Sequence, residues 1–148
     1  MVDGSNVDSF IRTPQVSNNV STVAKHPKIR EQILPLQRKL GNDPKVKGVV
    51  CEGRDIGTVV FPNADLKIFL IADPRVRAER RMKQNPELTD LEQVLQEILA
   101  RDEADMNREH APLKKASDAV EVDTTGMKIS EQVQHMAELV SQRIKARA

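Results

Sequence analysis

Arg101, Asp105 and Arg108 are spaced by four and then three residues, so on a helix their side chains form a single line. That line borders the apolar face of a helix predicted to start at the capping box 89–92. Arginine forks beside a carboxylate at the edge of a core suit a phosphate and a sugar hydroxyl. The same spacing is also typical of ion pairs within a helix, which contribute about a few tenths of a kcal/mol each.

A second arginine and carboxylate lie between two glycines in the stretch Gly53-Arg54-Asp55-Ile56-Gly57-Thr58. The preceding residues 46–51 are mostly apolar and long enough for a strand buried in a parallel sheet. We expect this strand to end in a tight turn that leaves Arg54 and Asp55 at the carboxyl edge, where open α/β sheets bind ligands. On the pattern alone, a turn with an ion pair between two glycines is more often structural than functional.

A basic cluster follows the clearest buried strand of the sequence, residues 66–71. Asp73 and Pro74 predict the start of a helix. On that helix Arg77, Arg80 and Arg81 stand at i, i+3 and i+4, so the three guanidinium groups share one face. A charge run of this kind is usually a solvated surface, and only the rest of the chain can favour another interpretation.

The remaining patterns alternate helices with strands, which predicts an α/β fold. Helices are expected to begin at Thr13-Pro14 and at Pro27, a third strand at 119–123, and a last helix capped by Ser130. Each helix carries an apolar stripe expected to face the core: Val16, Val20 and Val23 in the first; Ile29, Ile33, Leu36 and Leu40 in the second; Val133, Met136, Val140 and Ile144 in the last.

Composition limits the classes of function. The chain has 148 residues, of which 30% are charged, and a net charge of +1, as in an ordinary soluble globular domain. This balance gives no support for binding to nucleic acid or membrane, and the absence of a membrane span or signal peptide makes the cytoplasm the expected location. The single cysteine, Cys51, cannot form an internal disulfide and is expected to be a small buried hydrophobe.

Taken together, the motifs resemble those of one enzyme family. Residues 53–62 followed by 66–70 look like the central signature of bacterial cytidylate kinases. Residues 11–17 are similar to that family's insert beside the monophosphate site, and residues 101–113 to its region after the lid. The resemblance runs over nearly the whole chain, in order and at the right intervals.

The resemblance implies ATP-dependent phosphoryl transfer to CMP or dCMP, with Mg²⁺, giving CDP or dCDP. It implies a P-loop NTPase-type parallel sheet with flanking helices, and no metal-ligating residue is carried over. Residues 1–45 would be the remainder of the monophosphate-binding insert and the following helix. Residues 46–148 would be the C-terminal part of the kinase core, with a lid at about 77–105.

Carried over residue by residue, the resemblance assigns roles to ten side chains. Three fall where the family reads cytosine, whose exocyclic amine and ring acceptors suit a carboxylate, a hydroxyl and a guanidinium. Asp105 falls where the family binds the ribose, and the others fall at the phosphates or at the start of the lid, where arginines neutralise charge on the transferring group. The substrate-binding set is Ser21, Arg30, Arg54, Asp55, Arg101 and Asp105, and the catalytic set is Arg77, Arg80, Arg81 and Arg108.

One departure from the family is large. Its first strand and G-x-x-x-x-G-K-[ST] loop, which hold the ATP phosphates, have no counterpart in these 148 residues. We therefore expect an N-terminally truncated sheet that lacks the central P-loop strand. The strands at 46–51 and 66–71 would each keep an unpaired apolar edge, so we expect self-association in preference to direct pairing of the two.

Two functions of different class remain open on the sequence. In the first, the chain is the C-terminal portion of a cytidylate kinase. In the second, it is a non-catalytic module that binds a cytidine nucleotide or a protein partner. A basic RNA-binding helix around residues 75–83 is disfavoured by the net charge of +1.

Overall fold

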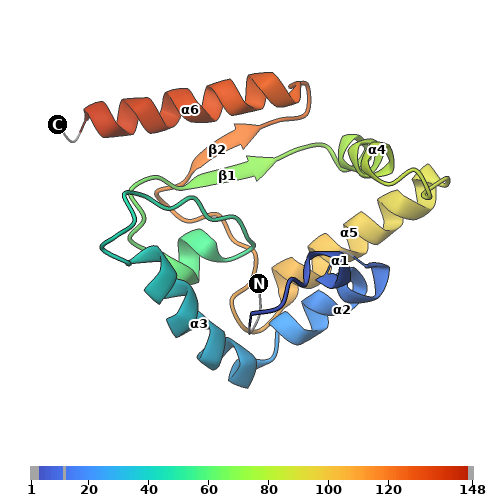
Figure 1. Ribbon diagram of the computed structural model, residues 1–148. Helices are drawn as coiled ribbons and strands as arrows, with labels where there is room; N and C mark the ends of the chain where they lie inside the picture. Colours follow the sequence, from blue (N-terminus) through green and yellow to red (C-terminus); the bar gives the residue numbers. More distant parts are fainter. Residues whose placement is uncertain (1–3, 12, 147–148) are drawn as a thin grey trace.

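The computed structural model describes residues 4–11 and 13–146, without the side chains of Pro14, Ser17, Asn18 and Ser21. Helices form most of the regular structure, around one small sheet (Figure 1). The elements in chain order are α1 (Asp8–Ile11), α2 (Pro14–Ala24), α3 (Pro27–Gly41), the π-helix η1 (Ile56–Val60), β1 (Ile68–Ile71), α4 (Pro74–Gln84), α5 (Leu91–Asn107), β2 (Val120–Asp123) and α6 (Ile129–Lys145).

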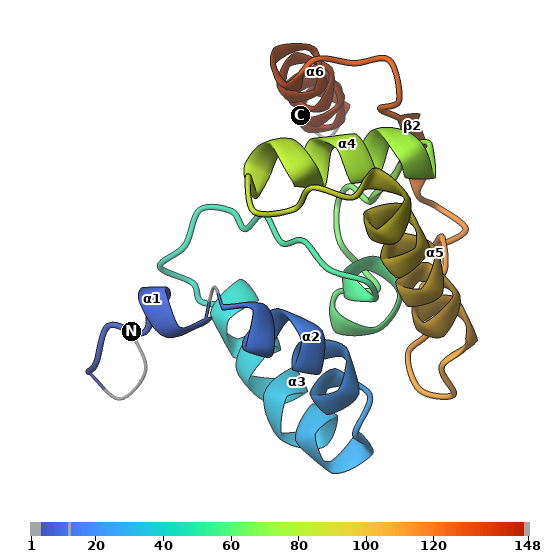
Figure 2. The same cartoon turned by 90° about the vertical axis from the view of Figure 1, so that its right-hand side faces the viewer.

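The sheet pairs β1 with β2 in parallel, with Ile68 opposite Val120 and Ile71 opposite Asp123. Parallel neighbours need a long connection, and here α4 and α5 supply it. Figures 1 and 2 show α6 at one end of the molecule and the α2–α3 pair at the other. The predicted α/β class and the strands near 66–71 and 119–123 are confirmed.

Local signals place the helix starts with small corrections. The Asp73 carboxylate accepts from the backbone N–H groups of Arg75 and Val76 at the start of α4, as predicted. For α5 the N-cap is Asp90 and not Thr89, because the Asp90 carboxylate accepts from the Gln93 amide.

The start of α6 also differs from the expectation that Ser130 caps it. The helix begins at Ile129, one residue before Ser130. The Glu131 carboxylate accepts from the Lys128 amide and satisfies that end of the helix instead.

The expected strand at 46–51 is absent from the described structure, and this prediction was wrong. Val50 is 99% exposed, and Cys51 is exposed as well, so its expected burial was also wrong. A strand needs a neighbour for its backbone N–H and C=O groups, and β1 pairs only with β2 among the described residues. Val49 and Ile68 are therefore not strand neighbours.

The buried apolar core is small: among the described residues, α4 packs against α5, and η1 packs against α3. Its buried apolar side chains are Val60, Ala78, Val94 and Val122. The apolar stripes predicted to face inward on α2, α3 and α6 are instead largely exposed; Leu40 and Ile144, for example, are 74% and 64% exposed. Helical spacing was predicted correctly there, but burial was not, because few described elements lie against those faces. Across the described residues, no helix is both long and apolar enough to cross a membrane.

Candidate functional site

Asp55 lies at the start of η1, where a strand followed by a tight turn had been expected. Its backbone carbonyl accepts from the amides of Thr58, Val59 and Val60, at 3.3, 2.9 and 3.2 Å. π-helices are rare in proteins, and those that occur are often found at functional sites. Asp55 is 9% exposed, so its carboxylate needs charged partners inside the protein.

Those partners come from distant parts of the chain. Arg30 of α3 donates through Nη2 to Asp55 Oδ2 and through Nη1 to the Ala24 carbonyl, which joins the end of α2 to the same site. Arg108 places Nη2 3.8 Å from Asp55 Oδ1. The two sequence-predicted residues Arg30 and Asp55 are therefore brought together, and Arg108 lies beside them.

A second buried carboxylate adjoins the first. Asp105, on the last turns of α5, is 5% exposed and accepts from Arg54 Nε at 2.7 Å. Arg108 Nη1 is 3.9 Å from Asp105 Oδ1. Because Arg108 faces both Asp55 and Asp105, the site is one connected cluster, which we call the acceptor cluster: Arg30, Arg54, Asp55, Asp105 and Arg108.

Arg108 occupies a special position in this cluster. It follows α5 as its C-cap residue, so it does not continue the helical line from Arg101 that the spacing predicted. Its side chain is 9% exposed, and the buried Nη2 has no hydrogen-bond partner among the described residues. Its Nε donates to the carbonyl of Ala111, whose φ of 51° is strained for a residue with a Cβ.

The other two predicted members of the substrate-binding set are not brought into the cluster by any described contact. Arg101 is exposed on α5, and no hydrogen bond or ion pair reaches its side chain within the part of the chain that is described. Ser21 lies in α2, but its side chain is outside the described residues.

An open pocket of about 450 Å³ borders the cluster. One wall comes from the corner between α2 and α3, with Thr22, Lys25 and His26, and the other from Arg108 and the two residues after it. Lys25 and Arg108 place two cations in its lining, and Glu109 places one carboxylate there.

The predicted lid arginines divide between two neighbours. Arg77 donates to Asp102 on α5, and Arg81 Nη2 lies 3.2 Å from Glu97 on the same helix. A further pair, Arg75 and Glu92 at 2.8 Å, joins the same two helices. Three arginines of α4 therefore face three carboxylates of α5.

Arg80 points to another element. Its guanidinium donates to the carbonyls of Thr124, Thr125 and Met127 in the loop between β2 and α6, and to the Thr124 hydroxyl. The i, i+3, i+4 spacing had predicted that the three guanidinium groups share one face. They do not, because Arg80 contacts a different element from Arg77 and Arg81. At the end of β2, hydrogen bonds from the Thr125 hydroxyl and amide hold the pKa of the Asp123 carboxyl below its usual value.

Arg38 is a contributor that sequence reasoning missed. From α3 it donates to the carbonyls of Val60 and Val59, at 3.0 and 2.8 Å. Its spacing of eight residues from Arg30, about two turns of helix, is the signal that could have indicated a second contact between α3 and the same partner.

Arginines donate to one oxygen of each carboxylate in the cluster, Oδ2 of Asp55 and Oδ2 of Asp105. No group of three or more His, Cys, Asp or Glu residues that could hold a metal occurs among the described residues. The cluster is instead suited to an anion at Arg108 and to hydrogen-bond donors at the two carboxylates.

The sequence of the chain is similar to those of one known family. The family model described as cytidylate kinase matches residues 1–142. A cytidylate kinase of Geobacillus sp. (strain WCH70) is 49% identical over 146 residues, which cover 97% of this chain and 64% of that protein. Cytidylate kinases of Enterococcus faecalis and Listeria innocua are each 48% identical, and the chain covers 63% and 64% of their lengths. The chain thus spans a little under two thirds of the curated relatives that it matches.

Proposed function

Because the chain belongs to the cytidylate kinase family, we propose that it acts in ATP-dependent phosphoryl transfer to CMP or dCMP, as the part that holds the nucleoside monophosphate. The observation that carries this proposal is the acceptor cluster, in which Arg108 stands between two buried carboxylates. It offers a cation for a phosphate and acceptors for the amine and hydroxyl groups of a nucleotide.

We assign base recognition to Asp55 and Arg30. The exocyclic amine of cytosine donates a hydrogen bond, which a carboxylate accepts, whereas uracil has a carbonyl at that position. Arg30 already holds Asp55 from one side, which supports a fixed orientation of the carboxylate. Ser21 completes the proposed set by family resemblance.

We assign the phosphate to Arg54, Arg101 and Arg108, and the ribose to Asp105. The buried Nη2 of Arg108 has no hydrogen-bond partner among the described residues, so it retains a donor for a phosphate oxygen. Arg54 is half exposed and already donates to Asp105, so it can reach a ligand while it orients that carboxylate.

We assign the lid to residues at about 77–105, a range that covers most of the α4–α5 hairpin. Arg77 and Arg81 would neutralise charge on the transferring phosphoryl group, and such neutralisation with positioning is most of what this reaction requires. In the structure both arginines are paired with α5 carboxylates, so they must exchange these partners for phosphate. The contacts of Arg80 favour a different role, because its acceptors are backbone carbonyls.

The use of ATP and Mg²⁺ enters this proposal from the family alone. The 148 residues contain no G-x-x-x-x-G-K-[ST] stretch, and the carboxylates of the acceptor cluster are engaged by arginines. The described residues do not fit a Mg²⁺–ATP site by themselves, and we derive no step through that group. In this proposal the chain's own residues bind and orient the acceptor nucleotide.

The test separates binding from turnover. Titration calorimetry of the 148-residue chain should detect CMP and dCMP and should give much weaker binding of UMP. A coupled assay should detect no phosphorylation of CMP by this chain alone, and turnover on the order of 1–100 s⁻¹ once it is joined to a segment that carries the family's phosphate-binding loop. Turnover at that rate by the chain alone, or equal binding of CMP and UMP, would contradict the proposal.

A second candidate is a non-catalytic module that binds a cytidine nucleotide or a protein partner. The acceptor cluster by itself supports nucleotide binding, which this candidate shares with the first. Under this alternative CMP still binds, but joining the chain to that loop produces no turnover. The same pair of experiments therefore distinguishes the two candidates.

A further inference from the structure

We propose that Arg38 is a positioning residue that orients the Asp55 carboxylate by holding the far end of η1; this inference rests on the proposed function of the acceptor cluster. Asp55 supplies the N-terminal end of η1, and its carbonyl is the acceptor for the amides of Thr58, Val59 and Val60. Whatever fixes the direction of η1 therefore also fixes where the Asp55 side chain points.

The C-terminal end of η1 needs a donor. The last carbonyls of a helix have no partner within the helix, and Val60 is 2% exposed, so water has little access there. Arg38 satisfies two of these carbonyls with one guanidinium, through Nε to Val60 and Nη2 to Val59. A cation at the C-terminus of a helix is also favourable to its dipole.

A second contact fixes the same end. A Cβ at Gly41 would lie 2.3 Å from the Phe61 ring, so the absence of a side chain at Gly41 lets that ring pack on the end of α3. Phe61 follows η1 directly, and its amide donates to the Ile56 carbonyl at 2.7 Å. The last turn of η1 is thus attached to α3 by a charged contact and by a close apolar one.

Together these contacts make α3 a rigid support for Asp55. Arg30 contacts the carboxylate itself, while Arg38, two turns along the same helix, contacts the other end of η1. With both ends attached to one helix, η1 cannot turn without breaking one of the contacts. The carboxylate is then presented to Arg30 and Arg108 before any nucleotide arrives, which lowers the cost of ordering it on binding.

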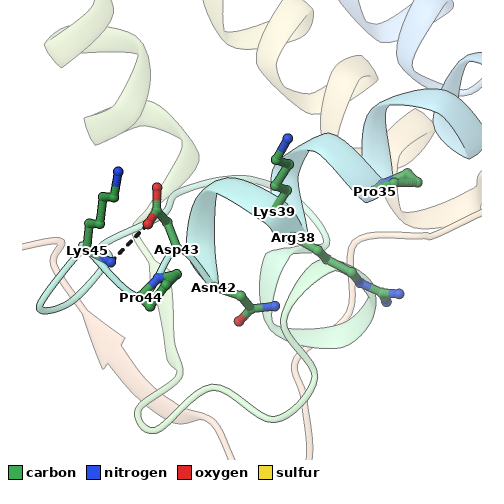
Figure 3. A pocket seen from close by; sticks show the side chains of 7 residues that line it. All are labelled: Pro35, Arg38, Lys39, Asn42, Asp43, Pro44 and Lys45. Atoms are coloured by element: carbon green, nitrogen blue, oxygen red, sulfur yellow. Dashed lines mark hydrogen bonds between the residues drawn. The ribbon is translucent and has the colours of Figure 1, made fainter.

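The experiment compares Arg38→Met with Lys39→Met as a matched control. Figure 3 shows that the two side chains leave α3 in different directions, and within the described residues no hydrogen bond reaches Lys39. Each variant removes one positive charge from the same turn of helix. Calorimetric titration with CMP should give a dissociation constant about tenfold higher for Arg38→Met, an intermediate rise for Arg38→Lys, and no change for Lys39→Met.

Hydrogen exchange of the amides at 58–61 supplies a second readout. It should be faster in Arg38→Met and slow again in Arg38→Lys, which retains a donor for one carbonyl. If exchange is faster but the affinity for CMP is unchanged, Arg38 supports only the local structure and the proposal is overturned. The lysine variant keeps this comparison available if the methionine variant does not fold.

A double-mutant cycle makes the result independent of the proposed function. If the unaltered chain binds no CMP, the proposed function fails, and the cycle between Arg38→Met and Asp55→Asn still tests whether Arg38 acts on Asp55 through η1. The changes in the free energy of unfolding should then be non-additive, since both changes act on one η1 segment. Additive effects would overturn the proposal.

Discussion

The charged clusters and the apolar surfaces of this chain differ in where their partners lie. Arg54 and Asp105 are 51 residues apart and meet at 2.7 Å in a half-buried pair. In contrast, the apolar run at 46–51, a few residues before Arg54, has no regular structure, and Val50 is 99% exposed. The acceptor cluster has partners within the described chain, and the apolar run does not.

This difference follows from what each kind of group requires. A buried carboxylate is stable once one or two cations reach it, and three separate parts of the chain supply them here. A buried strand requires a continuous row of backbone partners on both edges, which no single side chain can replace. Binding groups can therefore be organised in a chain whose sheet is small.

The largest effect should appear at the open edge of the sheet. In the ladder with β2, alternation of the backbone leaves the amides and carbonyls of Ile68 and Leu70 directed to the other edge of β1. We expect the 148-residue chain to associate with a second copy at micromolar concentration, which corresponds to about 8 kcal/mol. Leu70→Lys should make it monomeric, because a charge on an edge strand opposes further pairing.

Size-exclusion chromatography with light scattering measures this directly. Val133→Lys is the control, since Val133 is an exposed apolar residue on α6 and not on the sheet. A monomer with a sharp, cooperative melt for the unaltered chain would show that the exposed apolar residues do not require a partner.

Sequence patterns were sufficient where the signal and its partner are close along the chain. Asp73 and Pro74 correctly predicted the start of α4, and the apolar run at 66–71 correctly predicted β1, because a cap needs only the next amides and β1 pairs with a strand present in the chain. The same apolar signal at 46–51 predicted a strand incorrectly, because an apolar run does not indicate whether a neighbouring strand is available to pair with it.

The acceptor cluster shows the limit of sequence reasoning for a site. Spacing along α5 indicated that Asp105 borders the buried face, and it is indeed buried. No local pattern joins Asp105 to Arg54, or Arg30 to Asp55, 25 residues away. Their grouping came from family resemblance, and the contribution of Arg38 was not foreseen because its acceptors are backbone carbonyls.

The next largest effect concerns base selection at the acceptor cluster. Asp55→Ala should weaken binding of CMP by roughly 1.5–3 kcal/mol, the value of a hydrogen bond to a charged group. Binding of UMP should change less, because uracil lacks the exocyclic amine that contacts Asp55 in this proposal. Calorimetry with both nucleotides measures the two losses, and equal losses would make Asp55 a structural residue of η1.

A smaller effect separates Arg80 from its neighbours on α4. Arg80→Met should lower the free energy of unfolding by about 1–2 kcal/mol, because it removes the charged donor from the carbonyls of Thr124 and Met127, which then keep only the neutral donors of the Met127 amide and the Gln132 side chain. Arg75→Met is the matched control, since its pair with Glu92 is exposed and contributes little. Urea denaturation compares the two variants, and equal midpoints would show that Arg80 does not stabilise the loop.

The smallest effect tests whether the lid arginines are held only by screened surface contacts. Arg81 and Glu97 are about a third and nearly half exposed, so Glu97→Gln should reduce stability by about 0.2–1 kcal/mol in low salt. At 1 M salt the screening length falls to about 3 Å, and the difference should disappear. Glu103→Gln on the same helix is the control, because no ion pair reaches Glu103 within the described residues. A loss of stability that persists at 1 M salt would mean that the pair is held too firmly for Arg81 to exchange Glu97 for a phosphate. The proposed lid would then be a fixed part of the fold.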